Sequence, residues 1–218
     1  MKANRELHQV PDISDIVIHE PRPCGCSCRI GQDTSLRELQ ERVVRHCAPT
    51  LAGLKCGSMF RVCCCLHGII DHIEDIHSTV AHKGVRVDVL SSDGCGCLLY
   101  VYRPSLLEER LGDADVRSFL DGYGYTSYDA GGALEHLKER FSTEGMPAEI
   151  GVFLDYPMED IRGYIEHGGR NCLSIGCWKV YGDVDAAEKR FNCYRRCRDV
   201  YCRRFTEGYG LDRLSVRC

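Results

Sequence analysis

Residues 85–102 carry the pattern of a β-hairpin. The run "VRVDVL" alternates apolar and polar side chains, "SSDG" follows as a turn, and "CGCLLYVY" is a second apolar run. Two such runs joined by a short glycine-containing turn are typical of antiparallel strands. The chain is therefore expected to contain a sheet with at least one antiparallel pair.

Helix and strand patterns alternate on both sides of this hairpin. Apolar residues recur at helical spacing in residues 35–47, where Ser35 and Glu38 fit a capping box. Pro49 is expected to end or kink this helix, because proline lacks the amide hydrogen that a helix interior uses. Further helices are predicted over residues 68–84, 104–120, 133–141, 158–169 and 185–207, and further strands over residues 58–66, 149–154 and 173–181.

These patterns predict an α/β (α+β) fold with a mixed sheet of about five strands covered by helices. Strands that alternate with helices form a helix-covered sheet, and the hairpin adds an antiparallel pair to it. Residues 1–33 show no periodic apolar pattern and hold several prolines, glycines and cysteines. We therefore expect a flexible cysteine-rich N-terminal arm over residues 1–33 and a single domain over residues 34–218.

Charge and hydropathy argue against several classes of partner. The net charge is −4, so the chain as a whole does not attract nucleic acid, and a nucleic-acid partner is not expected. No apolar run reaches the roughly 18 residues that a membrane span needs, and no membrane partner is expected. The first residues lack the apolar core of a secretory signal. We expect a cytoplasmic protein.

The 16 cysteines are more than such a chain needs for packing. In a reducing cytoplasm they act as buried small hydrophobes, metal ligands or reactive thiols rather than as disulfides. No two of them have the C-x-x-C spacing of zinc ribbons and redox motifs. Cys24, Cys26 and Cys28 of the arm are separated by glycine and serine and are candidate ligands for a soft metal ion, the one cofactor considered.

The last predicted helix is interpreted as a docking helix. Its apolar stripe consists of Ala187, Phe191, Tyr194, Tyr201 and Phe205. Helical geometry places Cys202 on the core flank of this stripe, Cys197 at its border and Cys193 toward solvent. Arg198 falls near the centre of the stripe, where a guanidinium needs a carboxylate or a ligand, which makes it a candidate binding residue.

Residues 45–56, "RHCAPTLAGLKC", hold the strongest catalytic candidates: Cys47, the adjacent His46, and Lys55. A protonated His46 or Lys55 favours the thiolate of a nearby cysteine, which is its reactive form. Packing is the competing interpretation of Cys47, because it continues the apolar stripe of its helix.

Five blocks stand out in order over residues 36–216: "HCAPTLAGLK", "LLYVYR", "EIGVFLDYPMEDIRGYIE", "GCWKVYGD" and "CRDVYCRRF". Together they resemble, in the same order, the domain of unknown function 3793 family of anaerobic bacteria. The resemblance brings no established activity with it. It points to candidate binding residues Arg103, Trp178, Lys179 and Tyr181, and to candidate metal ligands Cys177, Cys197 and Cys47. The chain departs from the family pattern at Cys56 and at Asp155, where the pattern tends to glycine.

Three functions are compatible with these residues. The leading hypothesis is a ligand- or metal-binding protein or a redox-accessory protein. The second is a thiol-dependent enzyme that uses Cys47 or Cys177 as the nucleophile, and the third is a partner-binding protein whose cysteines are structural. The sequence leaves open whether the protein is an enzyme, and which ligand, partner and oligomeric state it has.

Overall fold

The structure is a computed structural model that describes residues 35–63, 69–93 and 96–217. The predicted N-terminal arm, with Cys24, Cys26 and Cys28, lies outside these residues. In chain order the elements are α2 (Leu36–Leu51), β1 (Gly57–Cys63), α3 (Ile69–Ala81), β2 (Arg86–Asp93), β3 (Gly96–Tyr102), α4 (Pro104–Gly112), α5 (Ala114–Asp121), α6 (Ala130–Glu144), α7 (Ile150–Phe153), α8 (Met158–Glu166), β4 (Ser174–Ile175), β5 (Lys179–Val180), α9 (Val184–Thr206) and α10 (Leu211–Leu214).

The main sheet has three strands in the order β1-β3-β2. The predicted hairpin is confirmed, because β2 pairs antiparallel with β3. Strand β1 also pairs antiparallel with β3. Since β1 and β2 both oppose β3, they run in the same direction, and α3 connects them across the sheet. The prediction of a mixed sheet was wrong, because every strand pair in the described residues is antiparallel.

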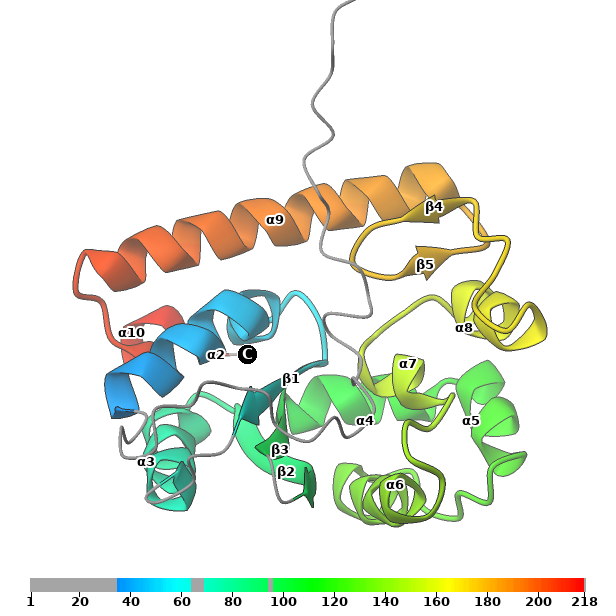
Figure 1. Cartoon of the computed structure of the whole chain (residues 1–218), viewed down its shortest axis with the longest axis horizontal. Helices are drawn as coiled ribbons and strands as arrows, with labels where there is room; N and C mark the ends of the chain where they lie inside the picture. The colour runs from blue at the N-terminus through cyan, green and yellow to red at the C-terminus, as the bar shows by residue number, and fades with distance from the viewer. Residues whose placement is uncertain (1–34, 64–68, 94–95, 218) are drawn as a thin grey trace, which may run out of the picture.

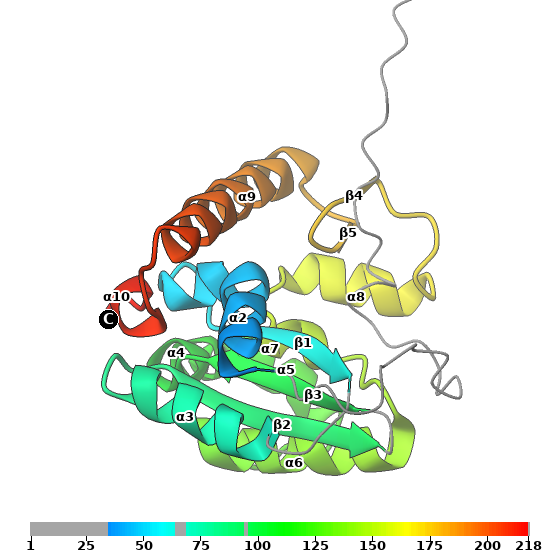
Figure 2. The same cartoon turned by 60° about the vertical axis from the view of Figure 1, so that its left-hand side comes forward.

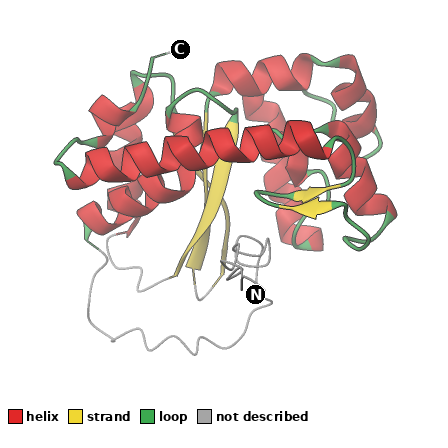
Figure 3. Cartoon of the chain, turned by 90° about the horizontal axis from the view of Figure 1, so that it is seen from above, coloured by secondary structure: helices red, strands yellow, loops and turns green. Residues whose placement is uncertain are grey.

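Both faces of this sheet are covered by helices, which confirms the α+β class (Figure 1). Alternate residues of a strand point to opposite faces, and every residue of the central strand β3 is buried. Leu99 and Val101 pack into a cluster with α2, α3 and α10. Leu98 and Tyr100 pack into a second cluster with helices α4 to α7. Figure 3 shows the strands between these two groups of helices.

Two predicted strands do not belong to the sheet, which is why the prediction of about five strands was wrong. The apolar run at residues 150–153 forms the short helix α7, all of it buried. A short apolar run does not distinguish a helix from a strand by its period. Residues 173–181 form a separate two-stranded hairpin, β4–β5, that reverses at Gly176. A Cβ atom at Gly176 would lie 2.1 Å from the Phe191 ring, so this close turn requires glycine.

Helix α2 begins as predicted, because Ser35 caps it and accepts a hydrogen bond from the Glu38 amide. Pro49 does not end it, since the helix continues to Leu51. Pro49 lies in the last turn, where the missing amide hydrogen removes one intrahelical bond. The carbonyl oxygens of Ala48 and Pro49 still accept hydrogen bonds from the residues that follow the helix. The segment therefore ends two residues later than its sequence indicated.

Helix α9 lies across the molecule, from the β4–β5 hairpin to α2 and α10 (Figures 1 and 2). The docking-helix interpretation is confirmed, because Ala187, Phe191, Tyr194 and Phe205 are buried and the fifth residue of the predicted stripe, Tyr201, is half-buried. Cys193 is exposed and Cys197 is half-buried. Cys202 packs against the α2 cluster, which is the cluster that Leu99 and Val101 form with α2, α3 and α10. No helix in the described part of the chain has the length and apolar character that a membrane span requires.

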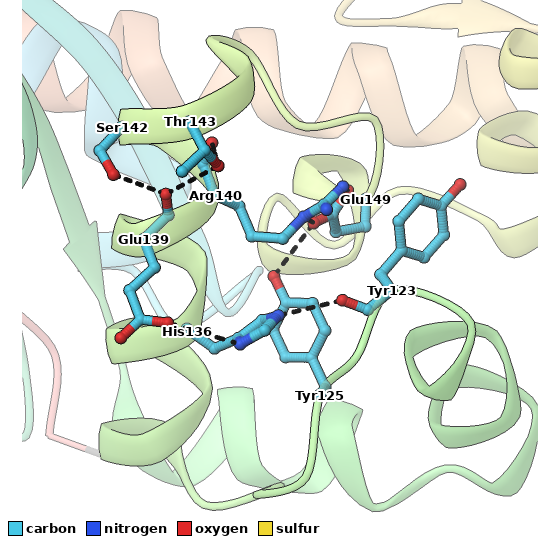
Figure 4. A network of polar contacts seen from close by, with 8 residues as sticks. All are labelled: Tyr123, Tyr125, His136, Glu139, Arg140, Ser142, Thr143 and Glu149. Carbon is cyan, nitrogen blue, oxygen red and sulfur yellow. Dashed lines mark hydrogen bonds and ion pairs between the residues drawn. The ribbon is translucent and has the colours of Figure 1, made fainter.

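A buried ion pair joins α6 to the start of α7 (Figure 4). The Glu149 carboxylate is fully buried and accepts a hydrogen bond from the Arg140 Nε at 2.6 Å. The Tyr125 hydroxyl donates to the same carboxylate. His136 packs edge-on against the Tyr125 ring and contacts the carbonyl oxygen of Tyr123. Since these groups satisfy one another, we interpret the network as structural.

Candidate functional site

Lys55 occupies an unusual position between three segments that are distant in the sequence. It lies in the loop between α2 and β1, and its ammonium nitrogen Nζ is 5.6 Å from the centre of the Tyr156 ring and 5.7 Å from that of Tyr194. Tyr156 follows α7, and Tyr194 lies on α9. Aromatic ring faces attract cations, so the two rings hold the ammonium group in place. Within the described residues, this nitrogen has no hydrogen bond and no ion pair within 4 Å.

Three thiols surround Lys55 closely enough to act on its pKa. They are Cys56, Cys177 and Cys47, and the structure thus brings together Cys47, Lys55 and Cys177, which the sequence proposed separately. Burial lowers the pKa of Lys55, whereas these thiols and Asp155 act in the opposite direction. Lys55 therefore holds a larger share of uncharged amine than an exposed lysine.

The thiols themselves are held in their protonated form. Cys47 is fully buried in the α2 cluster, as the packing interpretation expected, and burial raises its pKa strongly. Burial also raises the pKa of Cys56 to about 12, and it raises the pKa of Cys177. The positive charge of Lys55 opposes each of these changes but does not outweigh burial.

Asp155 supplies a partly buried carboxyl group to the site. Its backbone has a positive φ of 60°, a conformation that glycine adopts freely and aspartate adopts at a modest cost. The backbone amide of Cys56 lies close enough to this carboxylate to lower its pKa. Burial raises the pKa of Asp155, while the nearby cations of Arg110, Lys55 and Arg190 lower it by less.

A pocket of about 340 Å³ opens between the loop before β1 and helix α4. Its lining comprises Gly53, Leu54, Lys55, Cys56, Leu106, Glu109, Arg110, Asp113 and Asp155. Glu109 and Asp113 are exposed, and Cys56 is buried. The pocket thus combines charged groups of both signs with the partly buried Lys55 and Asp155.

Arg110 brings an unsatisfied donor to this pocket. One terminal nitrogen of its guanidinium donates to the Tyr156 carbonyl oxygen at 2.7 Å. Its Nε is buried and has no hydrogen-bond partner within the described chain. A buried donor without a partner is costly in a folded protein. An acceptor atom of a bound molecule would satisfy it.

The β4–β5 hairpin supports the site from behind. Trp178 is buried and stacks on Tyr156 with ring centres 4.9 Å apart. Its indole nitrogen donates to the Asp160 carboxylate at 2.6 Å, and the amides of Tyr181 and Gly182 donate to the other carboxylate oxygen. Trp178 therefore fixes the ring that contacts Lys55.

The other predicted residues of the hairpin are placed by local contacts. Lys179 is half-buried and donates from Nζ to the Gly169 carbonyl oxygen at 3.0 Å. Tyr181 stacks on His167, and its hydroxyl has no partner within the described chain. Neither side chain is among those that line the Lys55 pocket.

His46, Arg103 and Arg198 also lie outside the pocket. His46 is exposed and stacks on Phe60. Arg103 is fully buried and donates to backbone carbonyl oxygens. Arg198 is exposed and pairs with its neighbour Asp199, so its predicted place near the centre of the apolar stripe was wrong. Tyr194 is buried and Tyr201 is half-buried, whereas Arg198 is exposed.

The proposed metal ligands are not assembled into one site by the described residues, which contain no group of three His, Cys, Asp or Glu side chains arranged to hold a metal ion. Cys47 and Cys177 both lie close enough to Lys55 to raise its pKa. Cys197 does not act on Lys55 in this way, and burial together with the neighbouring Cys193 raises the pKa of Cys197 to about 11. The arm cysteines lie outside the described residues.

Sequence reasoning missed Arg110 and the contact of Tyr194 with Lys55. Tyr194 was assigned only to an apolar stripe, and Arg110 carried no local signal. Asp155 and Cys56 had been noted as departures from a family pattern. The glycine tendency at position 155 was the one available signal, because φ is positive there.

Fold and site together define an α+β protein with a helix-covered antiparallel sheet and a lysine-containing pocket beside the start of β1. The sequence model of the family described as "Protein of unknown function (DUF3793)" matches residues 43–215. The chain belongs to this family, as the resemblance indicated. No curated protein and no solved structure matches the chain.

Proposed function

We propose that the protein binds a small molecule bearing a carboxylate in the pocket formed by Lys55, Arg110 and Asp155. One observation carries this proposal: the side chains of Lys55 and Arg110 line the same pocket, and each has a nitrogen that makes no hydrogen bond among the described residues. The Nζ of Lys55 lies over two aromatic rings and has no hydrogen bond or ion pair among the described residues, where the Nε of Arg110 likewise has no acceptor. Arginine and lysine are the usual partners of carboxylates in binding sites.

The volume and lining of the pocket support a small ligand. A cavity of about 340 Å³ is at the lower end of the range for small-molecule sites. Leu54 and Leu106 offer apolar contacts, while the exposed Glu109 and Asp113 lie among the lining residues and disfavour large polyanions. A compact molecule with one carboxylate fits this arrangement better than a phosphate-rich one.

Thiol-dependent catalysis by Cys47 or Cys177 has weaker support. The thiolate is the nucleophilic form of cysteine, and burial raises the pKa of both thiols. Cys47 is also fully buried in an apolar cluster. The amine of Lys55, whose pKa changes in the favourable direction, is the better candidate for chemistry in this pocket.

Binding can be measured through Trp178, the only tryptophan of the chain, because it stacks on the ring that contacts Lys55. We expect a saturable change in tryptophan emission on titration with lactate, and a loss of this change in Lys55→Met. The exposed Arg45 provides a matched control, and Arg45→Met should bind as the wild type does. A response that does not saturate, or one that persists in Lys55→Met, would contradict the proposal.

A further inference from the structure

We propose that Lys55 forms an imine with the carbonyl carbon of a small α-oxo acid held in this pocket. This inference rests on the binding function proposed above and names the class of its ligand. It joins two features of the site: an amine and a carboxyl group that line the same pocket, and a guanidinium donor without an acceptor among the described residues. An α-oxo acid carries the complementary pair, a carbonyl carbon directly bonded to a carboxylate.

The surroundings of Lys55 are those of an amine nucleophile. An amine attacks a carbonyl carbon only in its uncharged form, and desolvation in an apolar pocket is a common way to produce that form in proteins. Burial lowers the pKa of Lys55. An imine is often protonated once formed, and the ring faces of Tyr156 and Tyr194 stabilise that cation as they do the ammonium group.

Asp155 is placed to carry the protons of the reaction. It lines the same pocket, and its charge acts on Lys55. Burial raises the pKa of Asp155, so it keeps its proton to a higher pH than an exposed aspartate. The backbone at this residue is held at φ 60°, a conformation in which a side chain is retained at a cost.

The reaction balances without an oxidant or a reductant. The Lys55 amine attacks the carbonyl carbon, a carbon–nitrogen bond forms, and the carbonyl oxygen takes a proton from Asp155. The nitrogen returns a proton to Asp155, which leaves a neutral carbinolamine. Asp155 then protonates the hydroxyl group, which departs as water while the nitrogen lone pair forms the C=N bond. One amine and one ketone give a protonated imine and one water beside an ionised Asp155.

Arg110 positions the other end of the ligand. Its terminal nitrogen is anchored on the Tyr156 carbonyl oxygen at 2.7 Å, which fixes the guanidinium relative to the ring that contacts Lys55. Its free Nε donor then takes a carboxylate oxygen of the ligand. A carboxylate bound in this way orients the adjacent carbonyl carbon of the ligand toward Lys55.

Reductive trapping tests the imine directly. The full-length protein is incubated with pyruvate and sodium cyanoborohydride, which reduces an imine to a stable secondary amine. Intact mass and peptide mapping then locate the product. We expect one attached group per chain, on Lys55. Thiols also add to carbonyl compounds, but cyanoborohydride does not convert their adducts into a stable linkage, so the product reports on amines.

Matched variants separate the specific reaction from background. Lys55→Arg keeps the positive charge between the two tyrosine rings and should abolish the adduct. Lys83→Arg changes another partly buried lysine, which pairs with Asp212 at 3.5 Å, and should leave the adduct unchanged. Asp155→Asn should slow formation of the adduct, because an amide cannot carry the protons of the reaction.

Each outcome has one meaning. A slow reaction spread over exposed lysines, equal in the wild type and Lys55→Arg, would overturn the imine. If lactate and pyruvate both bind saturably but pyruvate is not trapped, the result supports the proposed binding function and rules out the proposed imine. If neither binds, both proposals fall. Should Lys55→Arg not fold, peptide mapping of the wild type alone decides whether Lys55 is the modified residue.

Discussion

The side chain of Arg103 joins the end of α2 to the segment after α3 and to Val216. Arg103 was a candidate binding residue, yet its guanidinium is fully buried and donates to the carbonyl oxygens of Thr50, Leu51 and Val216. A further bond reaches the Lys83 carbonyl oxygen after α3. Carbonyl groups at helix ends have no intrahelical partner, so Arg103 satisfies several of them at once.

We expect Arg103→Met to destabilise the protein by at least about 3 kcal/mol, because it leaves several buried carbonyl oxygens without donors. Urea unfolding gives the free energy. Arg45→Met removes an exposed ion pair with Glu41 and should change stability by less than about 0.5 kcal/mol. Similar losses in the two variants would show that Arg103 does not hold these helix ends.

His46 should make stability depend on pH. Although the residue as a whole is exposed, desolvation of its imidazole, which stacks on Phe60, together with the charges of Arg42, Arg45 and Arg198, lowers its pKa from 6.5 to about 4. Between these values the unfolded chain binds a proton that the folded chain does not, so stability falls as the pH falls through this window. We expect His46→Gln to lose less stability than the wild type between neutral pH and pH 4. An unfolding-midpoint difference that does not change with pH would contradict this.

At the scale of elements, α9 should respond to cysteine substitution according to burial. We expect Cys202→Ser to destabilise by about 1 kcal/mol more than Cys193→Ser, because its hydroxyl would be placed against the α2 cluster. Cys193 is exposed, so its substitution should be nearly silent. Unfolding midpoints under reductant, with and without a chelator, test this. Equal, chelator-sensitive losses at Cys193 and Cys197 would indicate a metal site instead.

The β4–β5 hairpin depends on a buried carboxylate in α8. Asp160 accepts hydrogen bonds from the Trp178 indole and from the amides of Tyr181 and Gly182. We expect Asp160→Ala to cost about 3 kcal/mol or more and to shift the Trp178 emission to the red as the indole meets water. Asp115→Ala, at an exposed ion pair with Arg162, is the control. Unchanged emission in Asp160→Ala would show that the hairpin is held by packing alone.

At the scale of the whole molecule, deletion of residues 1–33 tests the predicted domain boundary. The clusters on both sheet faces are built from residues within 39–214. We therefore expect deletion of residues 1–33 to leave a cooperative thermal transition, shifted by no more than a few degrees. A larger shift, measured against the full-length chain by circular dichroism, would show that the arm is part of the fold.

The local sequence pattern predicted an element correctly where only one face of that element packs against the core. The apolar spacing of Ile69, Ile73, Ile76 and Val80 predicted the buried face of α3, and Ser35 predicted the start of α2. It failed where an element is buried all round or turns back on itself. The run at residues 150–153 has no polar face to show its period. The reversal at Gly176 depends on the approach of Phe191 from α9.

The sequence by itself determined the family, the α+β class, the central hairpin and the candidacy of Lys55, Cys47 and Cys177. These follow from local spacing and residue type. Only the tertiary structure decided which candidates meet. Arg110 and Asp155 reach Lys55 from α4 and from the segment after α7. Burial and charge set the chemistry of an amine or a thiol, and both come from neighbours distant in the chain.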